Sequence, residues 1–433
     1  MNWLKFNEEF NTTTISYLKK TQFNFFRCFS FSNTNIKAML IKDLSFLKRE
    51  VDFSYIERSF ENKVLKMVSN SKFLVIGGAG SIGSAVVKEI FCRNPLKLHL
   101  VDINENNLAE VVRDLRSSYG YIEGEFKTFC IDVGSVEYDV FFESDGNYDY
   151  VLNLSAMKHV RSEKDQYTLM RMVDINILNT IKTIDQCAQK KVKKYFCVST
   201  DKASNPSNLM GASKRIMELF LFSMSDKIDI STARFANVAY SDGSLLHGFI
   251  ERINKKQPLV SPKAIKRFFI SQRESGEICL MSCLFGENMD IFFPKLDSKN
   301  DLFLLEDVAK NFLIKNNLKP LIVSSEDEAR RAISNTESGF WPLFLSNSDT
   351  TGEKLFEEFY SDSDHVDNKS FLNLGVIKNR ANENKKNLKI FLDGITNLKT
   401  QKVWNKKDIV DLFFKVIPHF SYFDNGKYLD EKM

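Results

Sequence analysis

Lys72-Phe-Leu-Val-Ile-Gly-Gly-Ala-Gly-Ser-Ile-Gly83 is the stretch of sequence that decides the fold. Its apolar first half predicts a short buried strand, and its spaced glycines predict a tight turn that leads into an amphipathic helix. Glycines in such a turn let backbone amides approach a pyrophosphate, and the helix N-terminus adds partial positive charge. Because a strand and a helix flank the turn, we expect a dinucleotide site here. Its predicted contacts are Gly77, Gly80, Ser81, Ile82 and Gly83.

The next apolar run, Lys97-Leu-His-Leu-Val-Asp102, predicts a second strand that ends in a carboxylate. Asp102 follows the glycine turn by roughly 20 residues, the spacing at which such folds bind the hydroxyls of the adenosine ribose. A carboxylate at this point favours NAD over NADP as the cofactor.

Strand-like runs alternate with helical stretches from Lys72 to about Arg234. This alternation predicts an α/β fold, a Rossmann-type doubly wound parallel sheet. The later strands are expected over 126–132, 148–154, 194–199 and 228–235. We predict four parts: an N-terminal helical extension (1–70), an NAD-binding Rossmann domain (71–236), a smaller substrate-binding region of mixed α/β structure that could return to the sheet (237–390), and a C-terminal helical extension (391–433).

Polar residues at strand ends are expected to face the crevice where such sheets bind ligands. Asp132 is placed to meet the adenine, and its alternative role is to cap the following helix. The predicted dinucleotide set continues with Val133, Asn153, Ser155, Ala156, Lys158, Asn176 and Lys214.

The composition is that of a cytoplasmic protein. A formal charge of +4 over 433 residues is too small to indicate nucleic acid as a partner. The seven cysteines lack paired spacing, so they are expected to be reduced thiols, and Cys279 and Cys283 are expected to pack in the core rather than to bind a metal. We predict no metal site. No apolar run reaches the length of a membrane helix, and the N-terminus lacks the order of a secretory signal.

An acid and an amine stand side by side in Ser199-Thr-Asp-Lys-Ala-Ser-Asn-Pro206, at the end of the predicted fifth strand. Asp201 and Lys202 could act as a proton donor and a base if their pocket raised the pKa of the carboxyl and lowered that of the amine. The alternative is an ion-paired turn before the proline. Met210 and Lys214 lie four residues apart on the following predicted helix, so they share one face.

These motifs resemble the extended short-chain dehydrogenase/reductases and, within them, the nucleotide-sugar 4,6-dehydratases of bacterial polysaccharide synthesis. The resemblance covers about residues 73–267, and the tail segments Trp341-Pro342 and Ser348–Lys354 also match. It implies UDP-N-acetylglucosamine as the substrate and a homo-oligomer, a dimer or larger. The segments that carry it are the glycine turn, Ser155-Ala-Met-Lys-His-Val160, Ser199-Thr-Asp-Lys-Ala203 with Asn205-Pro206, Met210-Gly-Ala-Ser-Lys-Arg215 and Ala233-Arg-Phe-Ala-Asn-Val238.

The activity implied by the resemblance oxidises carbon 4 of the sugar, removes the carbon 5 proton, expels the carbon 6 hydroxyl as water and returns the hydride to carbon 6. Asp201 would supply the proton donor and Lys202 the base, while Ser199 would hydrogen-bond the carbon 4 oxygen. Met210 departs from the tyrosine of most relatives and cannot exchange a proton, although some similar dehydratases also carry methionine. The proton would then pass through Lys214, Ser199, Thr200 or a water.

Substrate contacts are expected partly beyond the predicted Rossmann domain, with Arg267 matching an arginine that meets the diphosphate in relatives. The predicted substrate set is Lys158, Asn205, Arg234, Asn237 and Arg267. For Arg234 a structural pairing is the alternative to a phosphate contact. Two alternatives stay open: an epimerase or reductase of the same fold, and a non-catalytic protein that binds NAD or a nucleotide sugar.

Three features are predicted in the C-terminal part of the sequence. The acidic segment 356–365 is expected to be a solvated helix face, 379–389 an exposed connector, and 406–416 an amphipathic helix.

Overall fold

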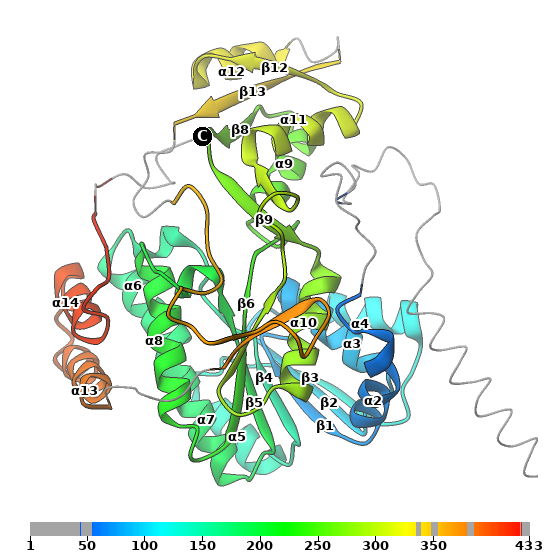
Figure 1. The fold of residues 1–433 in the computed structure, drawn as a ribbon, viewed down its shortest axis with the longest axis vertical. Helices are drawn as coiled ribbons and strands as arrows, with labels where there is room; N and C mark the ends of the chain where they lie inside the picture. The colour runs from blue at the N-terminus through cyan, green and yellow to red at the C-terminus, as the bar shows by residue number, and fades with distance from the viewer. Residues whose placement is uncertain are drawn as a thin grey trace, which may run out of the picture.

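The computed structural model describes residues 44, 54–334, 339–347, 354–378, 385–424 and 426. A nine-stranded sheet forms its centre (Figure 1). All its strands are parallel except the last two, which run antiparallel to their neighbours. In spatial order they are β3 (Glu125–Cys130), β2 (Lys97–Asp102), β1 (Lys72–Ile76), β4 (Tyr150–Asn153), β5 (Lys194–Thr200), β6 (Asp229–Phe235), β10 (Asp290–Pro294), β15 (Leu374–Lys378) and β14 (Val366–Asp367).

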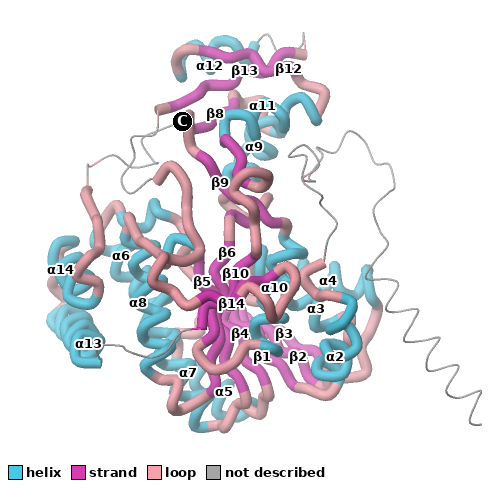
Figure 2. The backbone as a smooth tube through the Cα atoms, viewed as in Figure 1, coloured by secondary structure: helices cyan, strands magenta, loops and turns pink. Residues whose placement is uncertain are grey.

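Helices cover both faces of this sheet (Figures 1 and 2). One face carries α2 (Arg58–Ser69), α3 (Ser81–Phe91), α4 (Glu105–Tyr119) and α10 (Gln272–Phe285), and the other carries α5 (Val136–Asp145), α6 (Gln166–Val173), α7 (Asn179–Gln189) and α8 (Leu209–Ser223). Three short turns of helix lie between strands: η2 (Val160–Glu163), η3 (Asp174–Leu178) and η4 (Asp201–Ala203). The predicted doubly wound α/β fold is confirmed.

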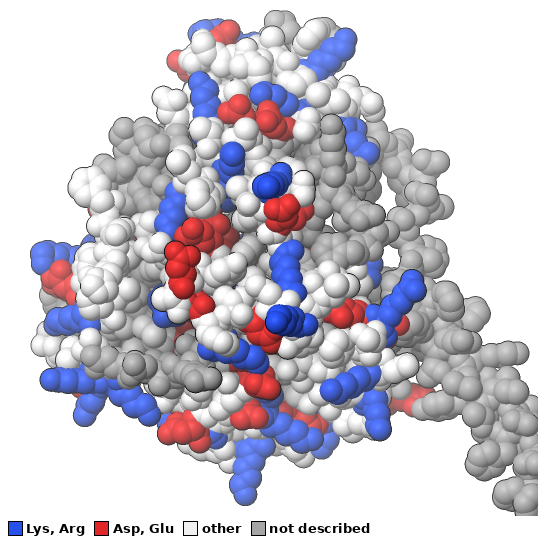
Figure 3. Space-filling view, in the orientation of Figure 1, with Lys and Arg blue, Asp and Glu red and all other residues white. Residues whose placement is uncertain are grey.

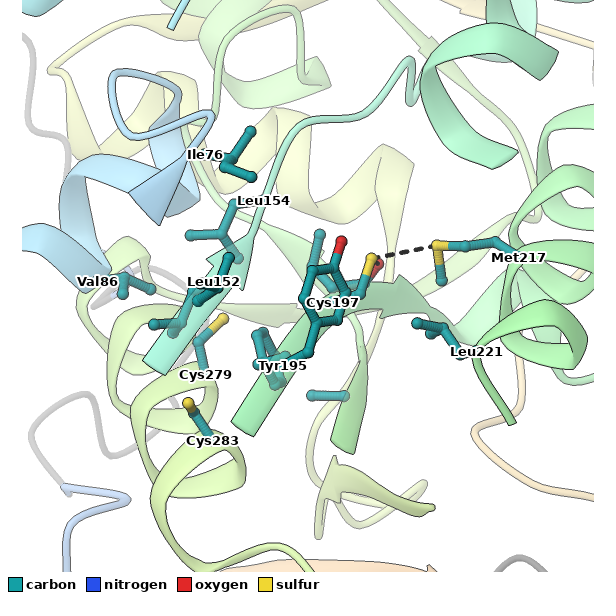
Figure 4. Close-up of a cluster of buried hydrophobic side chains, with 14 of the residues drawn as sticks. Ile76, Val86, Leu152, Leu154, Tyr195, Cys197, Met217, Leu221, Cys279 and Cys283 are labelled. Carbon is teal, nitrogen blue, oxygen red and sulfur yellow. Dashed lines mark hydrogen bonds between the residues drawn. The ribbon is translucent and has the colours of Figure 1, made fainter. Parts of the chain in front are cut away.

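The strands form where their sequences are apolar on both sides. In β5 the first six residues are all buried, as expected for a strand covered by helices on both faces. Figure 4 shows Tyr195 and Cys197 of this strand packed in the core with Met217 of α8. Cys279 and Cys283 of α10 are buried in the same cluster and are free thiols, so their predicted role in core packing is confirmed.

Helix α10 lies against α3 at unusually short range. A Cβ atom on Gly276 would come within 2.7 Å of the Ala85 backbone, so only glycine allows this approach. The N-terminus of α10 is fixed by a capping box between Ser271 and Glu274.

A smaller unit lies beyond the carboxyl ends of the parallel strands (Figure 1). It has its own apolar core around Phe249, Phe312 and Trp341. Its elements are α9 (Leu245–Asn254), β8 (Leu259–Pro262), α11 (Leu305–Lys315), β12 (Lys319–Val323), α12 (Glu326–Ala332) and β13 (Phe340–Ser346). A three-stranded ribbon joins it to the large sheet, made of β7 (Asn237–Val238), β9 (Lys266–Ile270) and β11 (Leu302–Leu304).

Two helices, α13 (Lys385–Gln401) and α14 (Lys406–Val416), follow the sheet in sequence. Helix α14 contacts α6 and α8, and α13 contacts α8. The predicted helix at 406–416 is confirmed. The expected connector at 379–389 is wrong from residue 385 onward, because α13 begins there and buries Leu388 and Phe391; residues 379–384 lie outside the described ranges.

The predicted four-part division stays a prediction, although β10 and β15 of the 237–390 region do join the large sheet. Most of the predicted N-terminal extension lies outside the described residues. Among the described helices, none combines the length and the apolar character needed to cross a membrane. Acidic and basic side chains are interspersed on the face shown in Figure 3.

Candidate active site

Two cavities adjoin at the carboxyl ends of the parallel strands. One of about 270 Å³ is lined by residues at the ends of β1, β2, β3 and β4, including Asp102 after β2 and Asp132 after β3. The other, of about 420 Å³, extends from the glycine turn to the smaller unit. They share Gly80, Leu154 and Ala156, so we describe them together as one crevice.

The glycine turn leaves room for a pyrophosphate. Gly77 has a φ of +74°, and a Cβ atom there would lie 2.7 Å from the Ser155 nitrogen. A Cβ atom on Gly83 would overlap the carbonyl oxygen of Gly77. Gly80 lines both cavities and is the N-cap of α3, where no side chain caps the first amides. Those amides fit an anionic group, and side chains on Gly77 or Gly83 would clash with the backbone that forms the turn.

At the outer end of the crevice, backbone amides fix two carboxylates. Asp102 accepts from the nitrogens of Ala79 (3.0 Å) and Asn104 (2.9 Å). Asp132 accepts from the nitrogen of Gly134 and pairs with Arg171 at 2.8 Å. Desolvation raises the pKa of Asp132, but the Gly134 and Arg171 bonds outweigh it and hold that pKa below its ordinary value. Val133 and Ser155 line the same cavity.

Two predicted dinucleotide residues, Asn153 and Asn176, are buried behind the crevice and do not line it. Asn153 accepts a 2.8 Å hydrogen bond from the Ser155 hydroxyl. Asn176 accepts from the nitrogen of Met157 and donates to its carbonyl oxygen. Both amides therefore brace the loop after β4, which lines the crevice.

The larger cavity, of about 420 Å³ and here called the inner cavity, brings together most of the residues that were predicted to carry the chemistry. Ser199, Thr200, Lys202, Met210 and Lys214 all line it. They come from the end of β5, from η4 and from the first turns of α8, which Asn208 caps by accepting from the nitrogen of Gly211.

Asp201 and Lys202 form a close pair at the start of η4. Nζ of Lys202 lies 3.0 Å from Oδ1 of Asp201, and the same oxygen accepts from the Lys202 nitrogen and the Thr200 hydroxyl, each at 2.8 Å. Lys202 lines the cavity, whereas Asp201 is buried beneath it. The carboxylate thus holds the amine at the cavity wall.

Lys214 is a buried lysine whose amine lies beside a sulfur atom. Its Nζ donates to Sδ of Met217 at 3.2 Å. Burial lowers the pKa of Lys214, and Cys197 and Glu218 oppose that shift. Because it lines the cavity, the amine can donate to ligand hydroxyls there.

Arg234 is placed differently from the predicted phosphate contact. It does not line either cavity, and its guanidinium binds both carboxylate oxygens of Glu218, at 2.9 and 2.8 Å. It also donates to the carbonyl oxygen of Phe359. Glu218 in turn accepts a 2.7 Å hydrogen bond from the Ser199 hydroxyl. Sequence reasoning missed Glu218, although it lies four residues after Lys214 on the same helix.

The cavity wall contributed by the smaller unit and its ribbon contains two predicted substrate residues, Asn237 and Arg267. Lys158 lines the mouth of the cavity, where desolvation lowers its pKa and Asp242 opposes that shift. Asn205 is exposed and does not line the cavity, and its carbonyl oxygen accepts from Nζ of Lys354.

Glu357 is a site residue that the sequence did not reveal. It is buried, and its Oε1 lies 3.9 Å from Nζ of Lys202 and 3.9 Å from Nη2 of Arg267. The helix predicted at 356–365 is wrong, because the segment is irregular and β14 begins only at Val366. Most of its residues are exposed, as predicted, but Glu357 is buried and faces basic groups of the site.

Comparison with known proteins gives a family match over most of the chain. A family described as polysaccharide biosynthesis protein matches residues 73–379. An uncharacterized membrane protein of Methanocaldococcus jannaschii is 30% identical over 355 residues, which are 81% of this chain and 96% of that protein. The capsular polysaccharide biosynthesis protein CapD of Staphylococcus aureus is 29% identical over 331 residues, 75% of this chain. This match spans only 49% of CapD, about half its length.

Solved structures share the fold at lower identity. Pen from Bacillus thuringiensis has a TM-score of 0.59 at 20% identity, covering 73% of this chain and 90% of that one. DesIV, a dTDP-glucose 4,6-dehydratase from Streptomyces venezuelae, has a TM-score of 0.50 at 16% identity, covering 66% and 87%.

Proposed function

The chain belongs to the polysaccharide biosynthesis protein family of extended short-chain dehydrogenase/reductases, and on that premise we propose that it is an NAD-dependent UDP-N-acetylglucosamine 4,6-dehydratase. The product would be a UDP-4-keto-6-deoxy-N-acetylhexosamine used in surface glycan or polysaccharide synthesis. We also propose, as the sequence suggests, a cytoplasmic homo-oligomer.

The observation that carries the proposal is the Asp201–Lys202 pair, in which Lys202 lines the inner cavity and the buried Asp201 carboxylate lies 3.0 Å from its amine. Elimination of water needs a base and a proton donor close together, and oxidation or reduction alone needs no such pair. Ser199 and Lys214 line the same cavity, which supports carbon 4 chemistry beside the pair.

The glycine cradle, Asp102 and Lys214 would hold a nicotinamide dinucleotide, which supplies a reversible hydride acceptor when bound. Asp102 supports NAD over NADP, because its carboxylate would repel a 2′-phosphate. The amine of Lys214 would donate to the ribose hydroxyls of the nicotinamide half.

Residues of the chain itself would then carry out the proton transfers. Lys202 would accept the carbon 5 proton, and Asp201 would give a proton to the departing carbon 6 hydroxyl. Because the two groups lie 3.0 Å apart, the proton gained by Lys202 can return to Asp201 between turnovers.

Met210 lines the cavity but has no proton to exchange. Ser199 donates its own proton to Glu218, so its lone pairs would accept the carbon 4 hydroxyl. We propose that Ser199 orients this hydroxyl while Lys214, Thr200 or a water carries its proton. Arg267 and Asn237 would meet the diphosphate and sugar from the side of the smaller unit.

The test is to incubate the purified protein with UDP-N-acetylglucosamine and catalytic NAD, following the sugar nucleotide by mass spectrometry and proton NMR and the absorbance of NADH. Loss of one water, a new methyl signal and no net NADH would support dehydration. Lys202→Gln should lower the rate by about 10²- to 10⁴-fold. Lys255→Gln, at an exposed lysine paired with Glu251, is the matched control and should leave the rate unchanged.

A second candidate, epimerisation, is favoured by the 27% identity to the UDP-glucose 4-epimerase of Rickettsia bellii, over 61% of this chain and 81% of that protein. It predicts an unchanged mass and a new anomeric pattern in the same assay. Binding of NAD and UDP-sugars without any conversion, in wild type and Lys202→Gln alike, would instead indicate a non-catalytic protein.

A further inference from the structure

Residues 354–360, here called the strap, lie beside the candidate active site and are hydrogen-bonded to two of the strands that carry it. The carbonyl oxygens of Lys354 and Leu355 accept from Nη1 of Arg267 (2.9 Å) and from the nitrogen of Lys266 (2.9 Å). At the other end, the carbonyl oxygen of Phe359 accepts from Arg234 at 2.8 Å. The strap is therefore tied both to β9 and to β6, on either side of the catalytic pair.

Glu357 lies at the middle of the strap, between the two attachments. Only 5% of its surface is exposed, whereas its neighbour Glu358 is exposed. Its Oε1 is 3.9 Å from the Lys202 amine and 3.9 Å from the Arg267 guanidinium, at the outer limit of an ion pair. One lysine is thus flanked by two buried carboxyl groups, Asp201 and Glu357.

The charged groups facing Glu357 come from several elements: Lys202 and Asp201 of η4, Arg267 of β9 and Lys354 of the strap itself. Burial raises the pKa of Glu357; Lys202 opposes this, Asp201 adds to it, and Arg267 and Lys354 oppose it. Where Glu357 is ionised, its negative charge favours the protonated form of the lysine beside it.

Resting on the proposed function, we propose that Glu357 is a positioning residue for the dehydration, which holds the Lys202 amine at the cavity wall and stabilises the ammonium formed when that amine takes the carbon 5 proton. The proton moves from carbon 5 to Lys202, and the carbon 6 oxygen leaves as water with a proton from Asp201. Glu357 neither gives up nor takes up a proton in this step.

Replacing Glu357 with a neutral amide should lower kcat without raising KM. Glu357→Gln removes the charge that stabilises the ammonium, so Lys202 becomes a weaker base and kcat should fall by about tenfold to a hundredfold. KM should stay level or fall, because Arg267 loses a carboxylate that competes with the substrate diphosphate. The acid-side inflection of the kcat profile should move to lower pH, since the amine loses its proton more easily.

The experiment compares wild type, Glu357→Gln, Glu357→Asp and Glu358→Gln in kcat, KM and pH profile for UDP-N-acetylglucosamine with NAD. Glu358→Gln makes the same charge change one residue away, on the exposed side, and should behave as wild type. Glu357→Asp keeps the charge and should recover part of kcat. A loss of kcat without the pH displacement, or an equal loss in Glu358→Gln, would overturn the proposal.

A second measurement does not need turnover. Trace acetylation at a fixed alkaline pH, followed by peptide mass spectrometry, measures how much of the Lys202 amine is unprotonated and accessible. Acetylation of Lys202 should be faster in Glu357→Gln than in wild type, Glu357→Asp or Glu358→Gln. Equal rates in all four proteins would refute the inference. If wild type dehydrates no UDP-, GDP- or dTDP-sugar, the proposed function fails, while acetylation still decides whether Glu357 controls Lys202.

Discussion

The hydroxyl of Ser199 donates a 2.7 Å hydrogen bond to Oε1 of Glu218, a carboxylate with no exposed surface. Arg234 binds both oxygens of the same carboxylate, and Arg215 adds a contact at 3.0 Å. The orientation of a cavity hydroxyl is therefore set by an ion pair that does not line the cavity.

Glu218→Gln is expected to destabilise the protein strongly. It leaves the buried Arg234 charge without its counter-charge, and breaking a buried pair in this way costs about 3–5 kcal/mol. Chemical denaturation measures the loss. Glu143→Gln, which removes an exposed partner of Lys190, should cost less than about 1 kcal/mol. A loss of equal size in both variants would contradict the assigned role of the buried pair.

Glu163→Gln is expected to change how stability depends on pH. Burial raises the pKa of Glu163 to about 7, although the amides of Leu209 and Met210 oppose that shift. The folded protein therefore holds this proton more tightly than the unfolded chain, whose glutamate titrates near 4.5. The protonated Glu163 therefore contributes about 3 kcal/mol to the free energy of unfolding below about pH 4.5. This contribution is lost as the pH rises to about 7.

The variant should match wild type at low pH and be more stable at pH 8, because its amide cannot ionise. Thermal melting across this pH range is the measurement. Glu110→Gln, at an exposed helix position, is the control and should follow the wild-type curve throughout. A constant difference between Glu163→Gln and wild type at every pH would contradict the shifted titration.

Lys214→Met is expected to lose dinucleotide binding while gaining stability. The amine is buried beside Met217 without a carboxylate bonded to it in the described structure, and burial lowers its pKa. Replacing a desolvated charge with an apolar side chain of similar length should stabilise the fold by about 1 kcal/mol or more. Calorimetry with NAD and denaturation test the two effects. Unchanged affinity for NAD would remove Lys214 from the cofactor site.

Asp102→Asn is expected to weaken the preference for NAD over NADP. The amide still accepts from a backbone donor but no longer repels a 2′-phosphate, so the ratio of the two dissociation constants should change by about tenfold, or 1.4 kcal/mol. Calorimetric titration with each dinucleotide measures that ratio. The same ratio in variant and wild type would place the origin of the preference elsewhere.

The sequence predicted the six strands of the Rossmann half closely because each strand is a local apolar run. Thus 194–199 became β5 (Lys194–Thr200) and 228–235 became β6 (Asp229–Phe235). Glycine spacing and strand ends are also local, which explains why Gly80, Asp102 and Asp132 were found and line the crevice.

Long-range pairing was not visible in the sequence. Glu357 lies 155 positions after Lys202 in the sequence, and an acidic run such as 356–365 has the same local pattern as a solvated helix face. Arg234 was predicted to contact phosphate or to form a structural pair. The structure shows the pair, but its partner Glu218 could not be identified from the sequence, because the two residues meet only when α8 packs against β6.

The strap also determines when, during synthesis, the site can be completed. The glycine turn and β1 to β6 emerge from the ribosome first, and chains fold from the N-terminus as they are made. At the ~5–20 residues per second typical of translation, Glu357 follows Gly83 by on the order of tens of seconds. A nascent chain could therefore form its dinucleotide cradle well before the carboxylate that faces Lys202 exists, so cofactor capture can precede catalytic competence on the ribosome.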